Sequence, residues 1–142
     1  MRKALEAAAE AGKMIDKDGE LLACDGNRTI SDNDPTAHAE ILVLREAARK
    51  IGNYRLTETV LYTTVEPCAM CAGALVNARV KRLVYGAKDE RFGAVETVFN
   101  ICDNSSLNHR MEITKGVLAD ECVKLMRDFF RAKRLKPENT GS

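Results

Sequence analysis

Two short motifs contain the residue types that zinc chemistry needs. His38 and Glu40 are separated by one alanine, while Cys68 and Cys71 lie three positions apart, directly after Pro67. Zinc binds imidazole and thiolate, and cysteines at positions i and i+3 of a helix point to the same side, close enough to share one tetrahedral ion. Three protein ligands leave the fourth position to water, which distinguishes catalytic from structural zinc. We therefore predict a catalytic Zn2+ ion held by His38, Cys68 and Cys71.

Glu40 is placed to move protons beside such an ion. Water on catalytic zinc ionises near neutral pH, and a carboxylate two residues from a metal-binding histidine can take the proton and return it to a ring nitrogen and a leaving amine. The helix dipole alone would also favour an acid at a helix start, and both roles can coexist. His-x-Glu followed by Pro-Cys-x-x-Cys is the mark of zinc base deaminases, so Glu40 is the predicted catalytic residue.

Other readings of the cysteines stay open at this point. Cys68 and Cys71 could form a redox pair, or a structural zinc site with Cys24 or His109 as the fourth ligand. His109 is better explained as a structural hydrogen bonder. The three remaining cysteines are expected to be small core residues, because unpaired cysteine is usually buried; they are Cys24, Cys102 and Cys122.

The apolar patterns predict the elements that position these motifs. Helices are expected at 2–11, 36–50, 68–79 and 118–134 with a short one near 95–102, and strands at 21–24, 59–65, 82–87 and 111–114. The strand, helix and strand from 59 to 87 form a parallel crossover unit. Ligands of such sheets bind at the carboxyl ends of the strands, beside helix N-termini, where both motifs are expected to lie. The free N–H groups of a helix start also favour thiolate over thiol.

Length and composition indicate one α/β domain over residues 1–136 with a loose tail at 137–142. The 22 basic and 21 acidic side chains give a net charge of +1, so any nucleic-acid contact must be local. No apolar run reaches membrane-spanning length, and the N-terminus lacks the apolar segment of a secretory signal. A cytoplasmic protein without membrane contact is the expectation.

The wider sequence resembles bacterial tRNA-specific adenosine deaminases, from Leu22 almost to Lys136. The similar segments are Gly26-Asn27-Arg28, residues 34–41, 53–56, 66–74 and 108–110, and Asp128-Phe129-Phe130. This resemblance implies the three-layer α/β/α cytidine deaminase-like fold with a central mixed sheet. It also implies a homodimer that deaminates the wobble adenosine of a tRNA anticodon loop to inosine.

The resemblance implies substrate contacts as well. Asn27 and Asn108 would touch the target nucleoside, and Phe130 would pack on a neighbouring nucleotide. Asp89, just past a predicted strand, is expected at the mouth of the site, although a solvated loop acid explains it equally well. Without the resemblance, Asn27 after Gly26 would be read as a turn residue.

One segment departs from the family pattern. Where the family has a strand with a Val-Pro-Val-Gly-Ala-like segment after the first helix, this chain runs from Gly12-Lys13-Met14-Ile15 into an expected turn at residues 16–19. Either the chain is a shortened deaminase whose sheet is rebuilt without its first strand and has an altered pocket wall, or a stretch of chain between residues 11 and 17 is absent from this sequence. Two other functions remain alternatives to a tRNA adenosine deaminase. One is a deaminase of another base, of single-stranded DNA or of a free nucleoside, and the other is a non-catalytic zinc or RNA-binding subunit.

Overall fold

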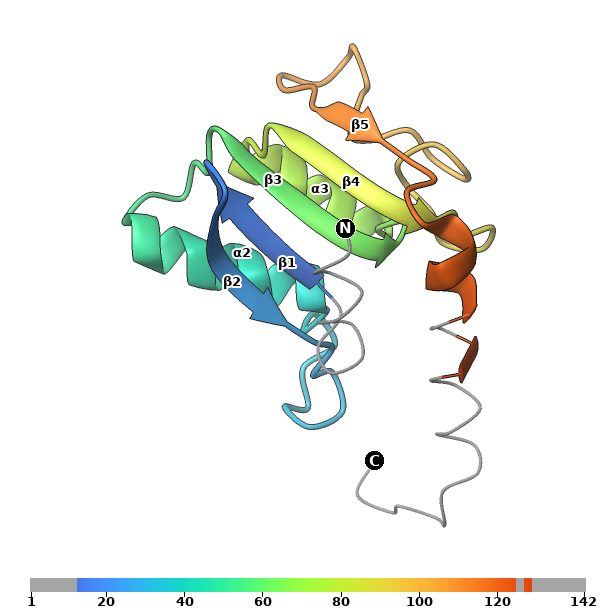
Figure 1. The fold of residues 1–142 in the computed structure, drawn as a ribbon. Helices are drawn as coiled ribbons and strands as arrows, with labels where there is room; N and C mark the ends of the chain where they lie inside the picture. The colour runs from blue at the N-terminus through green and yellow to red at the C-terminus, as the bar shows by residue number, and fades with distance from the viewer. Residues whose placement is uncertain (1–12, 125–126, 129–142) are drawn as a thin grey trace.

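The computed structural model describes residues 13–124 and 127–128 (Figure 1). The helix expected at 2–11, the tail at 137–142 and the candidate site residue Phe130 lie outside the described residues. Within the expected helix at 118–134, residues 119–124 are helical. None of the described helices is long and apolar enough to cross a membrane.

The centre of the fold is a mixed five-stranded sheet in the order β2-β1-β3-β4-β5. Its strands are β1 (Lys13–Lys17), β2 (Glu20–Asp25), β3 (Thr59–Val65), β4 (Arg82–Ala87) and β5 (Glu112–Thr114). Strand β1 is antiparallel to β2 and β3, whereas β3, β4 and β5 are parallel to one another. This confirms the α/β class and the central mixed sheet.

The strand that was expected to be missing is present as β1, so that expectation was wrong. Ile15 is fully buried and lies opposite Ala23 of β2 and Leu61 of β3. Asp18 and Gly19 join β1 to β2 with φ values of 53° and 80°, the positive φ pair that a tight right-twisted hairpin requires. Residues 13–17 therefore form an inner strand, and the sheet has no gap beside β3.

Two helices cover one face of the sheet (Figure 1). Helix α2 (Ala39–Ile51) ends at Gly52, whose φ of 77° is the left-handed conformation typical of a helix C-terminus. Helix α3 (Ala69–Ala78) connects β3 to β4 and is the crossover of the parallel unit. Both helices begin within a few residues of a predicted motif, so the helix starts determine where the functional side chains lie.

Leu61 lies at the centre of the core, and its truncation should be costly. It is fully buried between Ile15 of β1 and Leu83 of β4, which are also fully buried. We expect Leu61→Ala to lower the free energy of unfolding by about 2–5 kcal/mol, measured by urea denaturation. Leu21→Ala on edge strand β2, where the side chain is 54% exposed, is the control and should change stability little. A small loss at Leu61 would contradict this packing.

The cysteines outside the two motifs differ in burial, which corrects one expectation. Cys102 and Cys122 are buried as expected, but Cys24 on β2 is exposed. Burial, with smaller contributions from the carboxylates of Glu66 and Asp103, raises the pKa of Cys102 to about 12. Burial also raises the pKa of the Cys122 thiol.

We expect an alkylating agent to modify Cys24 of the folded protein well before Cys102 and Cys122, because thiolate and exposure govern reactivity. Mass spectrometry of peptides after timed iodoacetamide treatment measures this order. Cys24→Ser should remove the fast phase. Modification of Cys102 at a similar rate would show that the core opens readily.

Candidate metal centre and active site

The ligand candidates stand at the starts of the two helices. His38 is the N-cap residue of α2 and Cys68 is the N-cap residue of α3, both with extended backbone. Neither side chain caps its own helix by a hydrogen bond, so both are available for another partner. Pro67, fully buried, separates β3 from α3 and stops the strand. The predicted strand-to-helix junction is therefore present at Cys68.

The side chains of His38, Cys68 and Cys71 converge. Their ligand atoms all lie within 4.8 Å of one another. The Nδ1 atom of His38 is 3.7 Å from the sulfur of Cys68 and 3.5 Å from that of Cys71. A tetrahedral zinc ion, with Zn–S of about 2.3 Å and Zn–N of about 2.1 Å, holds such atoms about 3.6 Å apart. The donor set and its spacing therefore fit zinc.

Glu40 lies beside this cluster on α2. It is only 6% exposed, and its carboxylate is close enough to Cys71 to act on it by charge and hydrogen bonding. Burial first, and then the Glu40 and Cys68 groups, raise the pKa of the Cys71 thiol. Burial and the neighbouring groups thus oppose the Cys71 thiolate, which the helix start was expected to favour. A bound cation would supply the missing stabilisation.

The alternative fourth ligands do not join the cluster. Among the described residues, the group that could hold a metal contains neither Cys24 nor His109. The Nε2 atom of His109 is instead 2.8 Å from the carbonyl oxygen of Val80, which fits the structural role expected for this side chain. The geometry therefore favours a cluster with three protein ligands over a closed structural site.

Two candidate substrate residues make local turn hydrogen bonds. The side-chain oxygen of Asn27 accepts from the backbone N–H of Thr29 at 2.9 Å, and Asn27 is exposed in the loop after β2. The carboxylate of Asp89 accepts from the N–H groups of Arg91 and Phe92 at 2.9 and 3.1 Å. Asn27 thus makes the turn contact that was its alternative explanation, Asp89 accepts hydrogen bonds within its own loop, and both residues retain exposed surface.

Asn108 lies away from the cluster of its own chain. Its side-chain oxygen accepts a hydrogen bond of 2.8 Å from Arg79. Arg79 is the C-cap residue of α3, whereas Cys68 is the N-cap residue of the same ten-residue helix. At about 1.5 Å per residue, the helix separates the two ends by about 15 Å. The structure therefore does not bring Asn108 together with His38, Cys68, Cys71 and Glu40.

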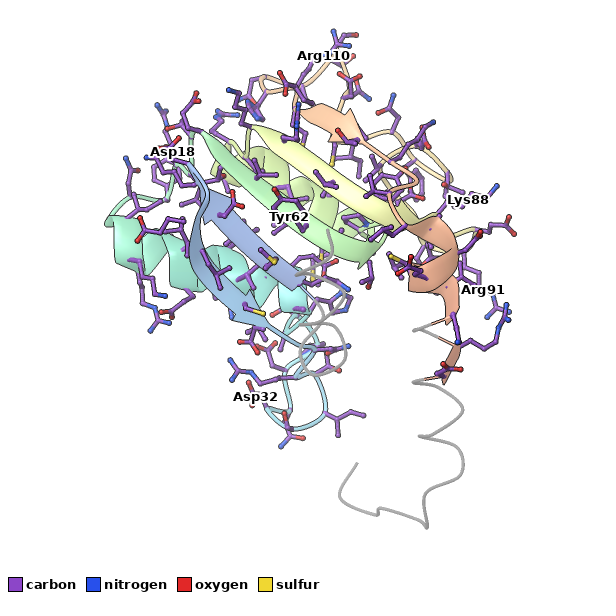
Figure 2. The ribbon with its side chains drawn as sticks, viewed as in Figure 1. Asp18, Asp32, Tyr62, Lys88, Arg91 and Arg110 are labelled. Atoms are coloured by element: carbon purple, nitrogen blue, oxygen red, sulfur yellow. The ribbon has the colours of Figure 1, made fainter. Side chains whose placement is uncertain are left out.

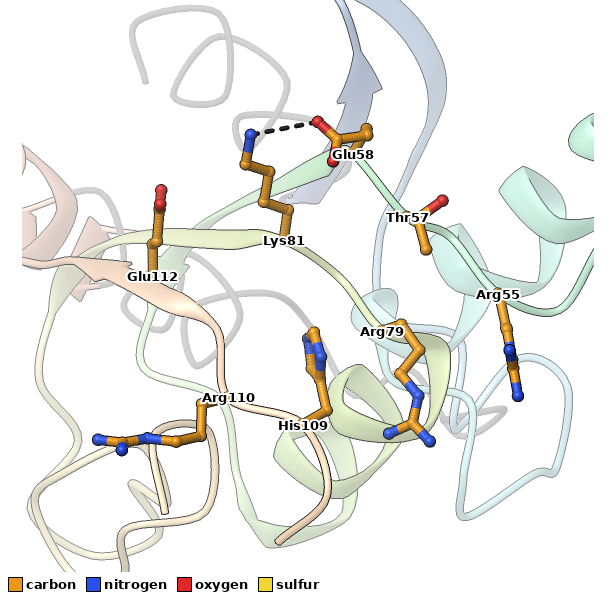
Figure 3. A pocket seen from close by; sticks show the side chains of 8 residues that line it. All are labelled: Arg55, Thr57, Glu58, Arg79, Lys81, His109, Arg110 and Glu112. Carbon is orange, nitrogen blue, oxygen red and sulfur yellow. Dashed lines mark hydrogen bonds and ion pairs between the residues drawn. The ribbon is translucent and has the colours of Figure 1, made fainter. Parts of the chain in front are cut away.

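Charged side chains gather at both ends of the sheet. Lys88 and Arg91 lie beyond the carboxyl end of β4, and Arg110 lies beyond the opposite end (Figure 2). At that opposite end a pocket of about 370 Å³ is lined mainly by charged groups, and Lys81 pairs there with Glu58 at 3.2 Å (Figure 3). Its lining residues are Arg55, Thr57, Glu58, Arg79, Lys81, His109, Arg110 and Glu112, none of which belongs to the metal cluster.

Glu66 was not singled out from the sequence, although it stands two positions before Cys68. It is 3% exposed. Burial acts to raise the pKa of its carboxyl, but hydrogen bonds from the backbone of Glu96, from Thr97 and from the Asp89 N–H outweigh burial and hold this pKa below its usual range. An acid directly after a buried strand was the available signal, since a buried charge needs a compensating partner.

A mixed sheet with a His-Cys-Cys cluster at two helix starts and a buried glutamate beside it defines the class of zinc base deaminases. The family of MafB19-like deaminases matches residues 2–134. A tRNA-specific adenosine deaminase of Haemophilus influenzae is 45% identical, over 94% of this chain and 83% of the relative. The chain therefore belongs to this deaminase family, within the group of the tRNA-specific adenosine deaminases.

Solved structures share the fold. One, from work on A-to-I editing by tRNA:A34 deaminases at the wobble position of transfer RNA, has a TM-score of 0.79 and 38% identity, covering 87% of this chain and 93% of that one. The guanine deaminase of Nitrosomonas europaea has a TM-score of 0.66 and 27% identity, with coverages of 90% and 77%. The fold thus occurs with more than one base as substrate.

Proposed function

We propose that this chain deaminates adenosine to inosine by hydrolysis, at the wobble position of a tRNA anticodon loop. The observation that carries the proposal is the convergence of His38, Cys68 and Cys71 within 4.8 Å, with buried Glu40 beside them. The substrate is inferred from the relative named as a tRNA-specific adenosine deaminase, at 45% identity over most of both chains. We assign residues 1–136 to one catalytic domain and place the enzyme in the cytoplasm, where its tRNA substrate is found.

His38, Cys68 and Cys71 would hold a Zn2+ ion as the cofactor. Zinc with three protein ligands lowers the pKa of a water molecule toward neutrality and so supplies the nucleophile for attack at C6 of adenine. Glu40 would accept a proton from the attacking water and pass it to N1 of the ring; it would then take the second proton of the same oxygen and deliver it to the amino group on C6, which leaves as ammonia. Its burial supports this role, because water is largely excluded around the carboxylate.

The substrate contacts form a second part of the proposal. Asn27 and Asp89 would contact the flipped nucleoside from the loops after β2 and β4, and Phe130 would pack on a neighbouring nucleotide. Asn108 would act from the other subunit of a homodimer. This division is supported by the position of Asn108 at the far end of α3 from Cys68. The partners in this proposal are a tRNA anticodon loop and a second copy of the chain.

A second candidate is a deaminase of a free base or nucleoside, of which guanine is the specific case. It is favoured by the structural likeness to a guanine deaminase at a TM-score of 0.66. That likeness is weaker in identity, at 27%, than the match to the adenosine deaminase relative, at 45%. The tRNA substrate is therefore the better supported.

One experiment separates these functions. The zinc-loaded protein is incubated in parallel with a tRNA anticodon stem-loop carrying adenosine at the wobble position, a single-stranded DNA of matching sequence, free adenosine, free cytidine and free guanine. We expect inosine in the stem-loop at a rate far above any other product. Faster turnover of guanine would support the second candidate, and no turnover of any substrate would favour a non-catalytic zinc or RNA-binding role.

A further inference from the structure

Glu66 carries a buried carboxylate with five hydrogen-bond donors around it. One of its oxygens accepts from the backbone N–H groups of Val95, Glu96 and Thr97, at 3.0, 2.9 and 3.1 Å. The other accepts from the N–H of Asp89 at 3.1 Å and from the hydroxyl of Thr97. A carboxylate that is 3% exposed is stable only when its lone pairs are satisfied in this way.

These bonds explain why residues 95–102 do not form the short helix expected there. The backbone of this stretch is irregular. Three consecutive N–H groups converge on one oxygen of Glu66, and Tyr85 and Lys115 bind the side chain of Glu96 at 3.0 and 2.7 Å. The loop shape is therefore determined by a residue nearly 30 positions earlier in the chain.

The same loop is joined to the segment that carries Cys68. The N–H of Ala94 donates to the carbonyl oxygen of Pro67 at 2.9 Å, and Pro67 directly precedes Cys68. Gly93 lies so close that a Cβ atom built there would be 2.5 Å from the Asp89 carbonyl oxygen and 2.5 Å from the Glu66 carboxylate. Loop 89–97 is thus pressed against the start of α3, with no room for a larger residue at position 93.

We propose that Glu66 is a positioning residue of the deamination site, which holds loop 89–97, and with it Asp89, as a fixed wall beside the metal ligands. This inference rests on the proposed function, because the wall matters only if a base binds there. The carboxylate touches neither the substrate nor the cluster in this arrangement. It acts through the loop backbone, so its contribution should fall on substrate binding more than on the chemical step.

Only a carboxylate satisfies all the donors that face this position. In Glu66→Gln one oxygen becomes an NH2 group, which donates instead of accepting. If the amide nitrogen faces Val95–Thr97, its N–H groups point at three backbone N–H donors. If it faces Asp89, they point at the N–H donor of that residue. In either orientation at least one buried donor loses its acceptor, and the loop must shift away.

The test compares Glu66→Gln with Thr97→Val and Gly93→Ala. Thr97→Val removes only the hydroxyl donor, and Gly93→Ala displaces the loop without changing the carboxylate, so either remains informative if Glu66→Gln fails to fold. Glu20→Gln, at an exposed position on edge strand β2, is the control. Each variant is measured for zinc per chain, for affinity to a tRNA anticodon stem-loop by fluorescence anisotropy, and for kcat and KM of inosine formation.

For Glu66→Gln and Gly93→Ala we expect kcat/KM to fall at least about tenfold, mainly through a higher KM, with zinc content equal to that of the unaltered protein. In Thr97→Val, kcat/KM should also fall and KM should also rise, but by smaller factors. Stem-loop affinity should weaken in parallel, which is a readout independent of turnover.

Two results would overturn the role of Glu66 alone. One is an unchanged KM and affinity in the folded variants, and the other is a loss of zinc that accounts for the whole loss of activity. If the unaltered protein neither binds nor deaminates the stem-loop, the proposed function fails and this inference fails with it.

Discussion

Replacing Glu40 by Gln should lower the rate of inosine formation by about 10³-fold or more while zinc stays bound. A positioned general acid and base contributes about 10²–10⁴-fold, and in the zinc base deaminases one glutamate serves every proton transfer. Glutamine keeps the size of the side chain and can donate a hydrogen bond, but it cannot carry the proton. Glu40 is 6% exposed, so no bulk water replaces it easily.

The measurement is single-turnover inosine formation in a wobble-adenosine stem-loop, together with zinc per chain. Glu46→Gln is the matched control, since Glu46 lies on the same helix and pairs with Arg49 on an exposed face. It should retain nearly full activity. If Glu40→Gln kept its zinc and stayed within tenfold of the unaltered rate, Glu40 would not be the proton carrier.

The cluster could be predicted from the sequence because its determinants are local. Cysteines three apart at a helix start share one side by helix geometry alone, and a proline before Cys68 marks that start. The position of His38 at a helix start could be predicted from Pro35 before that helix and Gly52 after it. The one long-range step, that the two helix starts meet, followed from the rule that such ends gather at the same edge of a parallel sheet.

Strand β1 could not be predicted, because its residues do not look like a strand. Lys13–Lys17 contains only Met14 and Ile15 as apolar residues, and they are adjacent instead of alternating. The strand exists because β2 and β3 pair with it on both sides, a stabilisation that no local pattern records. Comparison with the family pattern missed it for the same reason, since residues 13–17 lack a Val-Pro-Val-Gly-Ala-like segment.

The contacts of Asn108 and Glu66 could not be predicted from the sequence for the same reason. Nothing near Asn108 in the sequence indicates that it would bond to Arg79, 29 positions earlier. Nothing near Glu66 indicates that four of its five donors come from residues 95–97 and a fifth from Asp89. Residue type and spacing therefore predict which groups can do chemistry, while tertiary contacts decide which groups hold them in place.

Replacing Cys71 by Ser should remove zinc and abolish deamination together. Cys71 is fully buried and its sulfur is 3.5 Å from His38 Nδ1, and among the described residues the group that could hold a metal contains only His38 and Cys68 besides it. A serine hydroxyl is a poor zinc ligand, because zinc favours thiolate and imidazole. The change from sulfur to oxygen leaves the packing nearly intact, so any loss of stability should come mainly from the lost metal.

Zinc per chain, activity on the stem-loop and the thermal midpoint are measured for Cys71→Ser and for Cys102→Ser, a buried thiol outside the cluster. Only Cys71→Ser should lose zinc. Stripping the unaltered protein with a chelator should reproduce the loss, and added Zn2+ should restore activity. Since the ligands must lose protons to bind metal, the chelator should work more readily at mildly acidic pH. A Cys71→Ser variant that kept stoichiometric zinc would show that the ion is held elsewhere, and the assignment of all three ligands would fall with it.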